Sequence, residues 1–377
     1  TSFRLKEDWA INEIIAPSSS RTLVFRKLGI KPIMKQRILV AIALIGVLIG
    51  GAFVTHFYRV FFASNTAFET ASKEVLIPSK YTQRAAYDTL SKTVKRIDLF
   101  QQAATRKGYS PIPGRFIFEK GMNNNEMINR LRAENKPLKL TFNNKQTLMH
   151  LAGFVAKKIE ADSSSIATAF SDTTFLQENG FTPENVFSIC IPNTYEFFWN
   201  TNARQFRDRM LLEYNRFWTP KREAARRKMK LERTEVISLA AIVQLESYRV
   251  AERPTVAGVY LNRIRKRMRL QADPTIIYVL KRRANDFDLD IRRVLYEDLK
   301  IKSPYNTYRN RGVPPGPITM PDVSAIDAVL FAEKHKYLYF VADPDRTGYH
   351  LFATTLSQHN KNKKKYTTWL RQRNIYR

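Results

Sequence analysis

An uncharged apolar run near the start of the chain most constrains how it can fold. Residues 38–58 read ILVAIALIGVLIGGAFVTHFY and contain no Lys, Arg, Asp or Glu. About 20 apolar residues in a helix cross the hydrocarbon core of a bilayer, and the buried helix of a soluble domain rarely runs this long without a charge. Phe57 and Tyr58 at its far end suit a membrane–water interface. We therefore predict a single transmembrane helix at 38–58.

The charges before this run set its expected orientation. Positively charged flanks stay in the cytoplasm, and the preceding region is too long to belong to a cleaved signal peptide. We expect residues 1–37 to be cytoplasmic and the chain beyond about residue 59 to be periplasmic, as in a single-pass protein of the cell inner membrane. The basic residues of this flank are Arg21, Arg26, Lys27, Lys31, Lys35 and Arg37.

Composition narrows the possible partners and chemistries. The chain carries 63 Lys and Arg against 34 Asp and Glu, a net charge of +29, which favours contact with a polyanion such as nucleic acid, an anionic membrane or a wall polymer. The expected location beyond the membrane argues against nucleic acid. Cys190 is the only cysteine, so an internal disulfide or a cysteine-based zinc site is excluded. Because HExxH, GxSxG, P-loop and Rossmann motifs are also missing, we expect no metal and no cofactor.

The segment after the membrane, residues 64–142, predicts a small αβ module. A strand–turn–helix–strand pattern over residues 114–142 resembles a LysM-type glycan-binding module. The predicted elements are a strand at 74–77, helices over 82–107, a strand holding Phe116 and Phe118, a helix capped by Asn123, and a strand at 138–142.

Residues 143–377 predict a mixed, largely helical domain. Residues 199–233 read as helical with a heavily basic face, for which a solvated surface and contact with an anionic polymer both remain open. The other predicted features are a helix at 145–161, a loop at 163–165, a turn at 192–195, a helix opened by Pro254, strands at 337–341 and 348–352 that can pair with each other, and a basic helical tail.

Glu246 is the candidate catalytic residue. It ends a helix that we expect Thr234 to cap, and the preceding residues 236–245 are uncharged. Burial in such surroundings raises the pKa of a carboxyl group, which is the property that a general acid needs. The alternative is an exposed helix end at which Glu246 pairs with Arg249.

Two loops downstream carry groups that suit sugars. Gln271-Ala272-Asp273-Pro274-Thr275 breaks a helix, because a residue before proline disfavours helical geometry. Residues 303–308 and 313–317 combine proline with aromatic and amide side chains, which can stack on pyranose faces and bond hydroxyl or acetamide groups.

Taken in order, these segments resemble the endolytic murein transglycosylase family of the MltG/YceG type. The resemblance covers the chain from about residue 110 to its end. The matching blocks are LAAIVQLE at 239–246, VAGVYLNR at 256–263, MRLQADPTIIY at 268–278, YNTY at 305–308, GVPPGPI at 312–318, YLYFVAD at 337–343 and HN at 359–360.

The resemblance implies a membrane-anchored enzyme that cuts nascent peptidoglycan strands within the strand. The family's catalytic glutamate falls on Glu246, whereas Gln244 stands where relatives often carry a second glutamate. The implied fold is α+β: a transmembrane helix, a small LysM-like αβ module, and a mixed α/β catalytic domain at 143–377 with a mostly helical core around Glu246. Glycan strands are the implied substrate, the membrane a partner, and peptidoglycan synthases candidate partners.

The expected reaction cleaves the MurNAc–GlcNAc β-1,4 bond and leaves 1,6-anhydro-MurNAc ends, with Glu246 acting as acid and then as base. Asp273 is the rival second carboxylate, which would make the enzyme a lysozyme-like hydrolase; a turn-fixing role before Pro274 is the reading we favour. A catalytically silent wall-binding scaffold is the other alternative. The candidate substrate-binding residues, several of which could equally be loop scaffolding, are Gln271, Asp273, Thr275, Asn306, Thr307 and Tyr308.

Overall fold

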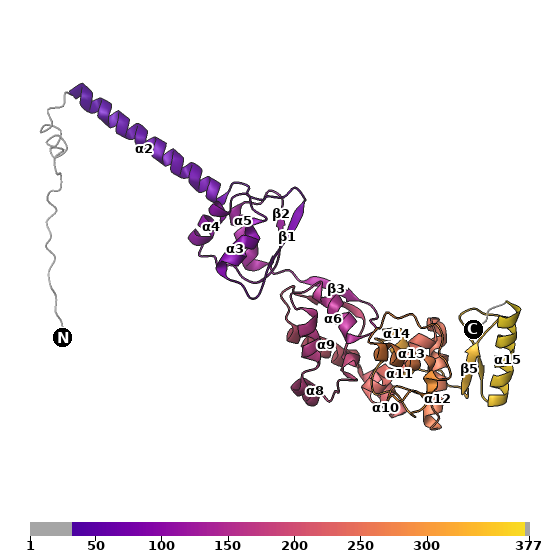
Figure 1. Ribbon diagram of the computed structural model, residues 1–377. Helices are drawn as coiled ribbons and strands as arrows, with labels where there is room; N and C mark the ends of the chain where they lie inside the picture. Colours follow the sequence, from indigo (N-terminus) through magenta and orange to yellow (C-terminus); the bar gives the residue numbers. More distant parts are fainter. Residues whose placement is uncertain (1–31, 374–377) are drawn as a thin grey trace, which may run out of the picture. The chain divides into compact units, whose positions relative to one another are not determined.

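The computed structural model describes residues 32–373, so most of the predicted cytoplasmic segment 1–37 lies outside it. The described chain is α+β, with elements that follow one another from α2 to α15 (Figure 1). It divides into two compact units: the first holds residues 32–73, 90–110 and 118–132, and the second holds 74–89, 111–117 and 133–373.

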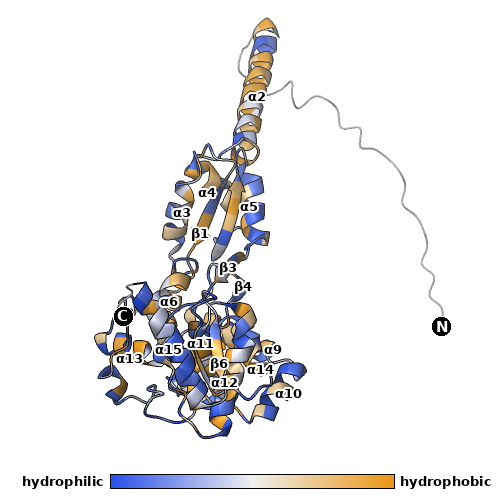
Figure 2. Cartoon of the chain, turned by 90° about the vertical axis from the view of Figure 1, so that its right-hand side faces the viewer, coloured by the Kyte–Doolittle hydropathy of each residue, from blue (hydrophilic) through white to orange (hydrophobic). Residues whose placement is uncertain are grey.

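Helix α2, Pro32–Phe61, contains the predicted span and extends beyond it at both ends. Among the described residues it is the one helix that is long and apolar enough to cross a membrane, and none of its most apolar stretch is buried. Figure 2 shows apolar residues along most of its length. A helix with apolar side chains on every face and no core around them is suited to lipid.

The elements that follow α2 confirm several local predictions. Strand β1 pairs with β2, and two helices occupy the region predicted to be helical. Asn123 caps α5 as predicted: its Oδ1 accepts from the Glu126 amide at 2.9 Å, and the Glu126 carboxylate accepts from the Asn123 amide at 3.0 Å. The elements are β1 (Ser72–Ile77), α3 (Gln83–Ser91), α4 (Ile97–Arg106), β2 (Gly114–Glu119) and α5 (Asn124–Ala133).

Strand β3, Leu138–Phe142, forms where predicted but has a different partner from the one expected. It pairs antiparallel with β4, Asn193–Phe197, in a register that places Leu140 opposite Tyr195. The strand meant to close the LysM-like unit therefore pairs with a distant segment, and the turn predicted at 192–195 is wrong. Both strands bury alternate residues, so pairing them covers one shared apolar face.

A further correction concerns the helices before the site. Residues 163–165, predicted as a loop, are the first turn of α7, because the Asp162 carboxylate accepts from the Ser165 amide at 2.8 Å and the Ser164 hydroxyl at 2.6 Å. No residue of the basic helix α10 is buried, as a solvated face requires. The elements here are α6 (Leu148–Ala156), α7 (Ser163–Phe170), α8 (Thr173–Asn179), η1 (Val186–Ile189), α9 (Ala203–Phe217) and α10 (Pro220–Met229).

Helix α11, Arg233–Glu246, is the centre of the second unit. All residues from 236 to 244 are buried, because α12, α13 and α14 pack around the helix. Its N-cap is Glu232, whose amide donates to the Glu235 carboxylate at 2.7 Å, so the predicted cap at Thr234 is wrong by two residues. The surrounding elements are η2 (Val250–Glu252), α12 (Arg253–Arg265), α13 (Asp273–Ala284), η3 (Asp298–Lys300) and α14 (Val323–Leu330).

A C-terminal hairpin lies against α12. Strands β5 (Tyr339–Ala342) and β6 (His350–Ala353) pair with each other as predicted, in antiparallel direction, and α15 (Leu356–Gln372) packs on both. Asn262 of α12 donates to the Tyr337 carbonyl at 3.0 Å. A Cβ at Gly258 would lie 2.4 Å from Nε2 of His335, so only glycine lets α12 approach this segment so closely.

Candidate active site

Glu246 is the last residue of α11, and its side chain is half-buried. The hydroxyl of Tyr260, a buried residue of α12, donates to Glu246 Oε1 at 2.8 Å. The pKa of Glu246 is raised to about 7: burial raises it most, the Tyr260 hydrogen bond lowers it, the charge of Asp273 raises it, and the charges of His350 and Arg263 lower it. The carboxyl is therefore partly protonated near neutral pH.

The alternative in which Glu246 pairs with Arg249 at an exposed end does not describe this site. Arg249 instead points Nη2 toward the Thr347 carbonyl, at 3.4 Å. The carboxyl group of Glu246 takes its hydrogen bond from Tyr260, and no ion pair joins it to Arg249 among the described side chains. The end of α11 thus presents a carboxyl group that forms no ion pair with a cation among residues 32–373.

Asp273 and Tyr308 form a second polar pair beside Glu246. Asp273 is the first residue of α13 and is exposed, and the Tyr308 hydroxyl donates to its Oδ1. Burial, the hydrogen bond to Asp273 and the charges of Asp273 and Glu246 all raise the pKa of Tyr308. Tyr308 therefore remains a hydrogen-bond donor at physiological pH.

Gln271 lies at the turn that precedes α13. Its φ is +52°, a left-handed conformation that few non-glycine residues adopt. Its amide donates to the Thr307 carbonyl at 3.2 Å, and its Oε1 lies 3.5 Å from Arg263 Nη1. The side chain is otherwise exposed, so Gln271 joins the polar surface around Asp273.

The other three candidates are buried, and their polar groups bond within the protein. Asn306 Nδ2 donates to the carbonyls of Leu299, at 3.0 Å, and Ile301, at 2.7 Å. Thr307 Oγ1 accepts from the Ala272 amide at 3.0 Å and lies 2.9 Å from Thr275 Oγ1. These side chains hold the 303–308 loop against the start of α13.

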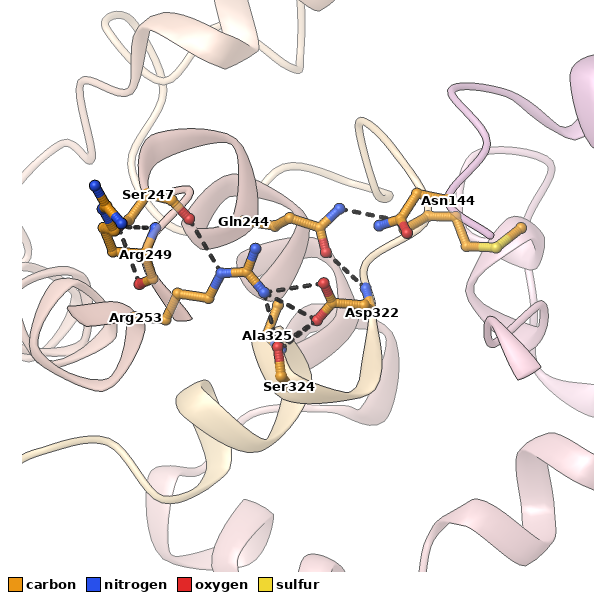
Figure 3. Close-up of polar contacts among 9 residues, drawn as sticks. Asn144, Gln244, Ser247, Arg249, Arg253, Asp322, Ser324 and Ala325 are labelled. Carbon is orange, nitrogen blue, oxygen red and sulfur yellow. Dashed lines mark hydrogen bonds and ion pairs between the residues drawn. The ribbon is translucent and has the colours of Figure 1, made fainter. Parts of the chain in front are cut away.

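Gln244 lies in a network of polar contacts with Asp322 and Arg253 (Figure 3). Its Oε1 accepts from the Asp322 amide at 2.7 Å, and its Nε2 lies 3.5 Å from the Met320 carbonyl. Asp322 in turn caps α14 through the Ala325 amide at 2.8 Å and pairs with Arg253 at 2.9 Å. An amide that both accepts and donates suits this buried position, which accounts for glutamine here.

Two groups beside Glu246 were not assigned a role from the sequence. One is Tyr260, whose hydroxyl had to find a partner once the residue was buried. The other is the buried carboxylate of Glu252, which accepts from the amide of His350 at 2.8 Å, from its Nδ1 at 2.7 Å and from the Ser247 hydroxyl at 3.2 Å. Burial raises the pKa of Glu252, but the hydrogen bonds and charge of His350 and the hydrogen bond from Ser247 lower it, and the net shift is downward.

A family model described as the YceG-like family matches residues 75–365. The chain belongs to this family. The family resemblance predicted from the motif blocks is thereby confirmed. The match includes every residue placed in the site above, from Gln244 to His350.

Curated relatives of the chain carry one name. A protein of Bacillus subtilis (strain 168), called endolytic murein transglycosylase, is 28% identical over 309 residues, which cover 77% of this chain and 83% of the relative. A protein of the same name from Streptococcus pneumoniae serotype 2 is 30% identical over 171 residues, which cover 45% of this chain but only 30% of that longer relative.

A solved YceG-like structure supports the fold. The crystal structure of a yceG-like protein from Listeria monocytogenes is 25% identical and superposes with a TM-score of 0.51. The match covers 78% of this chain and 99% of the Listeria chain. The α+β arrangement described above is therefore that of a known YceG-like protein.

Proposed function

We propose that this protein is a membrane-anchored endolytic lytic transglycosylase that cleaves the MurNAc–GlcNAc β-1,4 bond of nascent peptidoglycan strands. The enzyme class rests on family membership, because the relatives in B. subtilis and S. pneumoniae are named endolytic murein transglycosylases. The observation that carries the choice of Glu246 is its half-buried carboxyl, with a pKa of about 7 and a hydrogen bond from Tyr260. A general acid works best with a pKa near the operating pH.

In the proposed reaction Glu246 acts twice. Its protonated form donates to the oxygen that bridges MurNAc and GlcNAc, and that bond breaks as positive charge grows at the MurNAc anomeric carbon. The resulting carboxylate accepts the proton of the MurNAc C6 hydroxyl, whose oxygen closes on that carbon to give the 1,6-anhydro end. The attacking hydroxyl belongs to the same sugar, so proximity replaces a captured water. Tyr260 orients the carboxyl and stabilises the anion formed between the two steps.

We assign the six other predicted residues to two roles. We propose that the glycan is contacted by Gln271, Asp273 and Tyr308. Their polar side chains lie beside Glu246 and are exposed or half-buried. Thr275, Asn306 and Thr307 are buried, and we propose that they position the loop that carries Tyr308.

The position of Asp273 also supports a second candidate, a lysozyme-like hydrolase. Its charge is close enough to raise the pKa of Glu246, and ordinary glycosidases use two carboxyl groups. The Tyr308 hydroxyl, however, already donates to Asp273, which weakens this carboxylate as a nucleophile or base. We therefore prefer the single-carboxylate mechanism.

The proposed setting follows from α2. As a membrane anchor it would leave residues 1–37 in the cytoplasm and the catalytic domain in the periplasm, next to newly made strands. The glycan-binding role of the LysM-like module at 64–142 and the contact with peptidoglycan synthases belong to the same proposal.

The decisive experiment identifies the new ends made by the full chain on uncrosslinked glycan strands. Mass analysis should find 1,6-anhydro-MurNAc, whereas reducing ends would establish the hydrolase. Glu246→Gln should lower the rate by about 10²–10⁴-fold, the usual contribution of general acid–base catalysis. Glu178→Gln, which alters an exposed residue of α8, is the control. A native chain that cleaves nothing while it binds strands would indicate a silent scaffold.

A further inference from the structure

Two arginines beside the site share one tyrosine ring. The guanidinium carbon of Arg249 lies 5.4 Å from the Tyr349 ring centroid, and that of Arg346 lies 4.3 Å from it. Arg249 comes three residues after Glu246, while Arg346 and Tyr349 belong to the connection between β5 and β6. Both arginines are exposed and the ring is half-buried. The ring thus brings together two cations that are distant in sequence.

Neither arginine has an acidic partner among residues 32–373. Three acids close to them in sequence have other partners: Glu252 accepts from His350 and Ser247, Asp345 pairs with Lys365 at 2.5 Å, and Asp343 accepts from the Asp345 amide at 3.0 Å. Within the described part of the chain, the Arg249 guanidinium donates to one group, the backbone carbonyl of Thr347. Two like charges held near one ring repel each other, so an anion that bound both would relieve the repulsion and gain charge-assisted hydrogen bonds.

This cluster of Arg249, Arg346 and Tyr349 is attached to the end of α11 that carries Glu246. Ser247 donates to Glu252, and the same carboxylate accepts the amide of His350, the residue after Tyr349. Gly348 permits the close approach: its φ is +82°, and a Cβ there would lie 3.1 Å from Arg249 Nε. Hydrogen bonds through Ser247, Glu252 and His350 therefore link this cluster to the helix end that carries Glu246.

We propose that this cluster binds a carboxylate of the stem peptide carried by MurNAc, so that peptide-bearing strands are the preferred substrate. Guanidinium groups bind carboxylates through paired hydrogen bonds. The stem peptide hangs from the lactyl group of the sugar whose glycosidic bond breaks, so its acids lie near the reacting carbon. This inference rests on the proposed function, since it concerns the substrate of the same site.

The test compares two glycans cut by the full chain in detergent: uncrosslinked strands with free-carboxylate stem peptides, and the same strands after an amidase has removed the peptides. The native chain should show a higher kcat/KM on the peptide-bearing strands. The double variant Arg249→Ala/Arg346→Ala should lose that preference, by roughly tenfold in the ratio of the two values. The native chain should also show no preference, in kcat/KM, for peptide-bearing strands whose peptide carboxylates have been amidated.

A matched control removes two other exposed arginines, Arg204 on α9 and Arg227 on α10, and should leave the ratio unchanged. The inference would be overturned if Arg249→Ala/Arg346→Ala left the ratio of the two kcat/KM values unchanged. It would also be overturned if both double variants lowered that ratio equally. Binding to chains carrying Glu246→Gln separates the two proposals. Suppose that the native chain cuts no strands, yet the Glu246→Gln chain binds peptide-bearing strands more tightly and loses this preference without Arg249 and Arg346. The proposed function is then wrong, and the proposed role of the cluster is supported. If the native chain cuts strands but shows no such preference, the proposed function is supported and the role of the cluster is wrong.

Discussion

At the scale of single residues, the contact between Tyr260 and Glu246 decides what the site can do. A carboxyl group that was only buried would stay protonated and could not become the base of a second step. The Tyr260 hydrogen bond opposes burial and brings the pKa to about 7. One group can then donate a proton and take one back within a single turnover.

This balance predicts a pH dependence for Tyr260→Phe. Cleavage requires protonated Glu246 at the start, so kcat/KM of the native chain should fall as pH rises through about 7. Removing the hydroxyl removes a contact that lowers the pKa of Glu246, so this alkaline limb should move to higher pH. The maximal rate should also fall, because the carboxyl loses its orienting bond. Rate profiles from pH 5 to 9 measure both effects.

Tyr278→Phe is a suitable comparison, because it removes another partly buried hydroxyl, one in contact with the Tyr305 ring rather than with Glu246. An alkaline limb that Tyr260→Phe leaves in place, or shifts to lower pH, would contradict the assigned role of Tyr260.

At the scale of elements, the start of α13 and the 303–308 loop form one unit. Asn306 bridges the carbonyls of Leu299 and Ile301, and its Oδ1 accepts from the Tyr308 amide at 2.9 Å. Thr307 bonds to the residue that caps α13. The loop therefore presents Tyr308 to Asp273 because buried side chains hold its backbone in place.

Asn306→Asp should destabilise this unit. The substitution replaces an NH₂ donor by an oxygen. The carbonyls of Leu299 and Ile301 then lose their donor and face a repelling oxygen, which should lower the free energy of unfolding by about 2 kcal/mol. The melting temperature of the full chain, followed by tryptophan fluorescence, should fall by several degrees. Asn360→Asp, at an exposed position of α15, should change it little. Equal melting temperatures for both variants would show that the loop does not depend on Asn306.

At the scale of the whole molecule, a net charge of +29 and the apolar helix α2 act together. In the proposed topology the apolar span anchors the chain in a membrane, and the basic flank before it favours a cytoplasmic N-terminus. The excess of positive charge beyond α2 then suits an anionic wall polymer rather than nucleic acid.

The orientation of α2 can be measured directly. A periplasmic reporter enzyme fused after residue 59 should be active, whereas the same reporter fused before residue 32 should be inactive. Removing residues 32–61 should release the protein from the membrane fraction. The proposed topology would be reversed if the reporter were inactive after residue 59 and active before residue 32.

The sequence alone predicted the features that depend on neighbouring residues. Short-range patterns predicted the apolar run within α2, the burial of α11, the Asn123 cap and the β5–β6 hairpin. The motif blocks also indicated the family. Local capping was less certain: the cap of α11 at Glu232 and the start of α7 at Ser163 both differ from prediction, because several nearby residues could have capped either helix.

Only the tertiary structure decided which distant groups meet. Strand β3 could have paired with any strand of alternating pattern, and the partner, β4, lies some fifty residues away. Likewise, the pKa of Glu246 depends on Tyr260, Asp273 and His350, which come from other elements, and Asn306 and Thr307 look like surface loop residues until the fold buries them. Local free energy determines where a helix runs, whereas proton affinity and strand pairing depend on contacts that no short stretch of sequence contains.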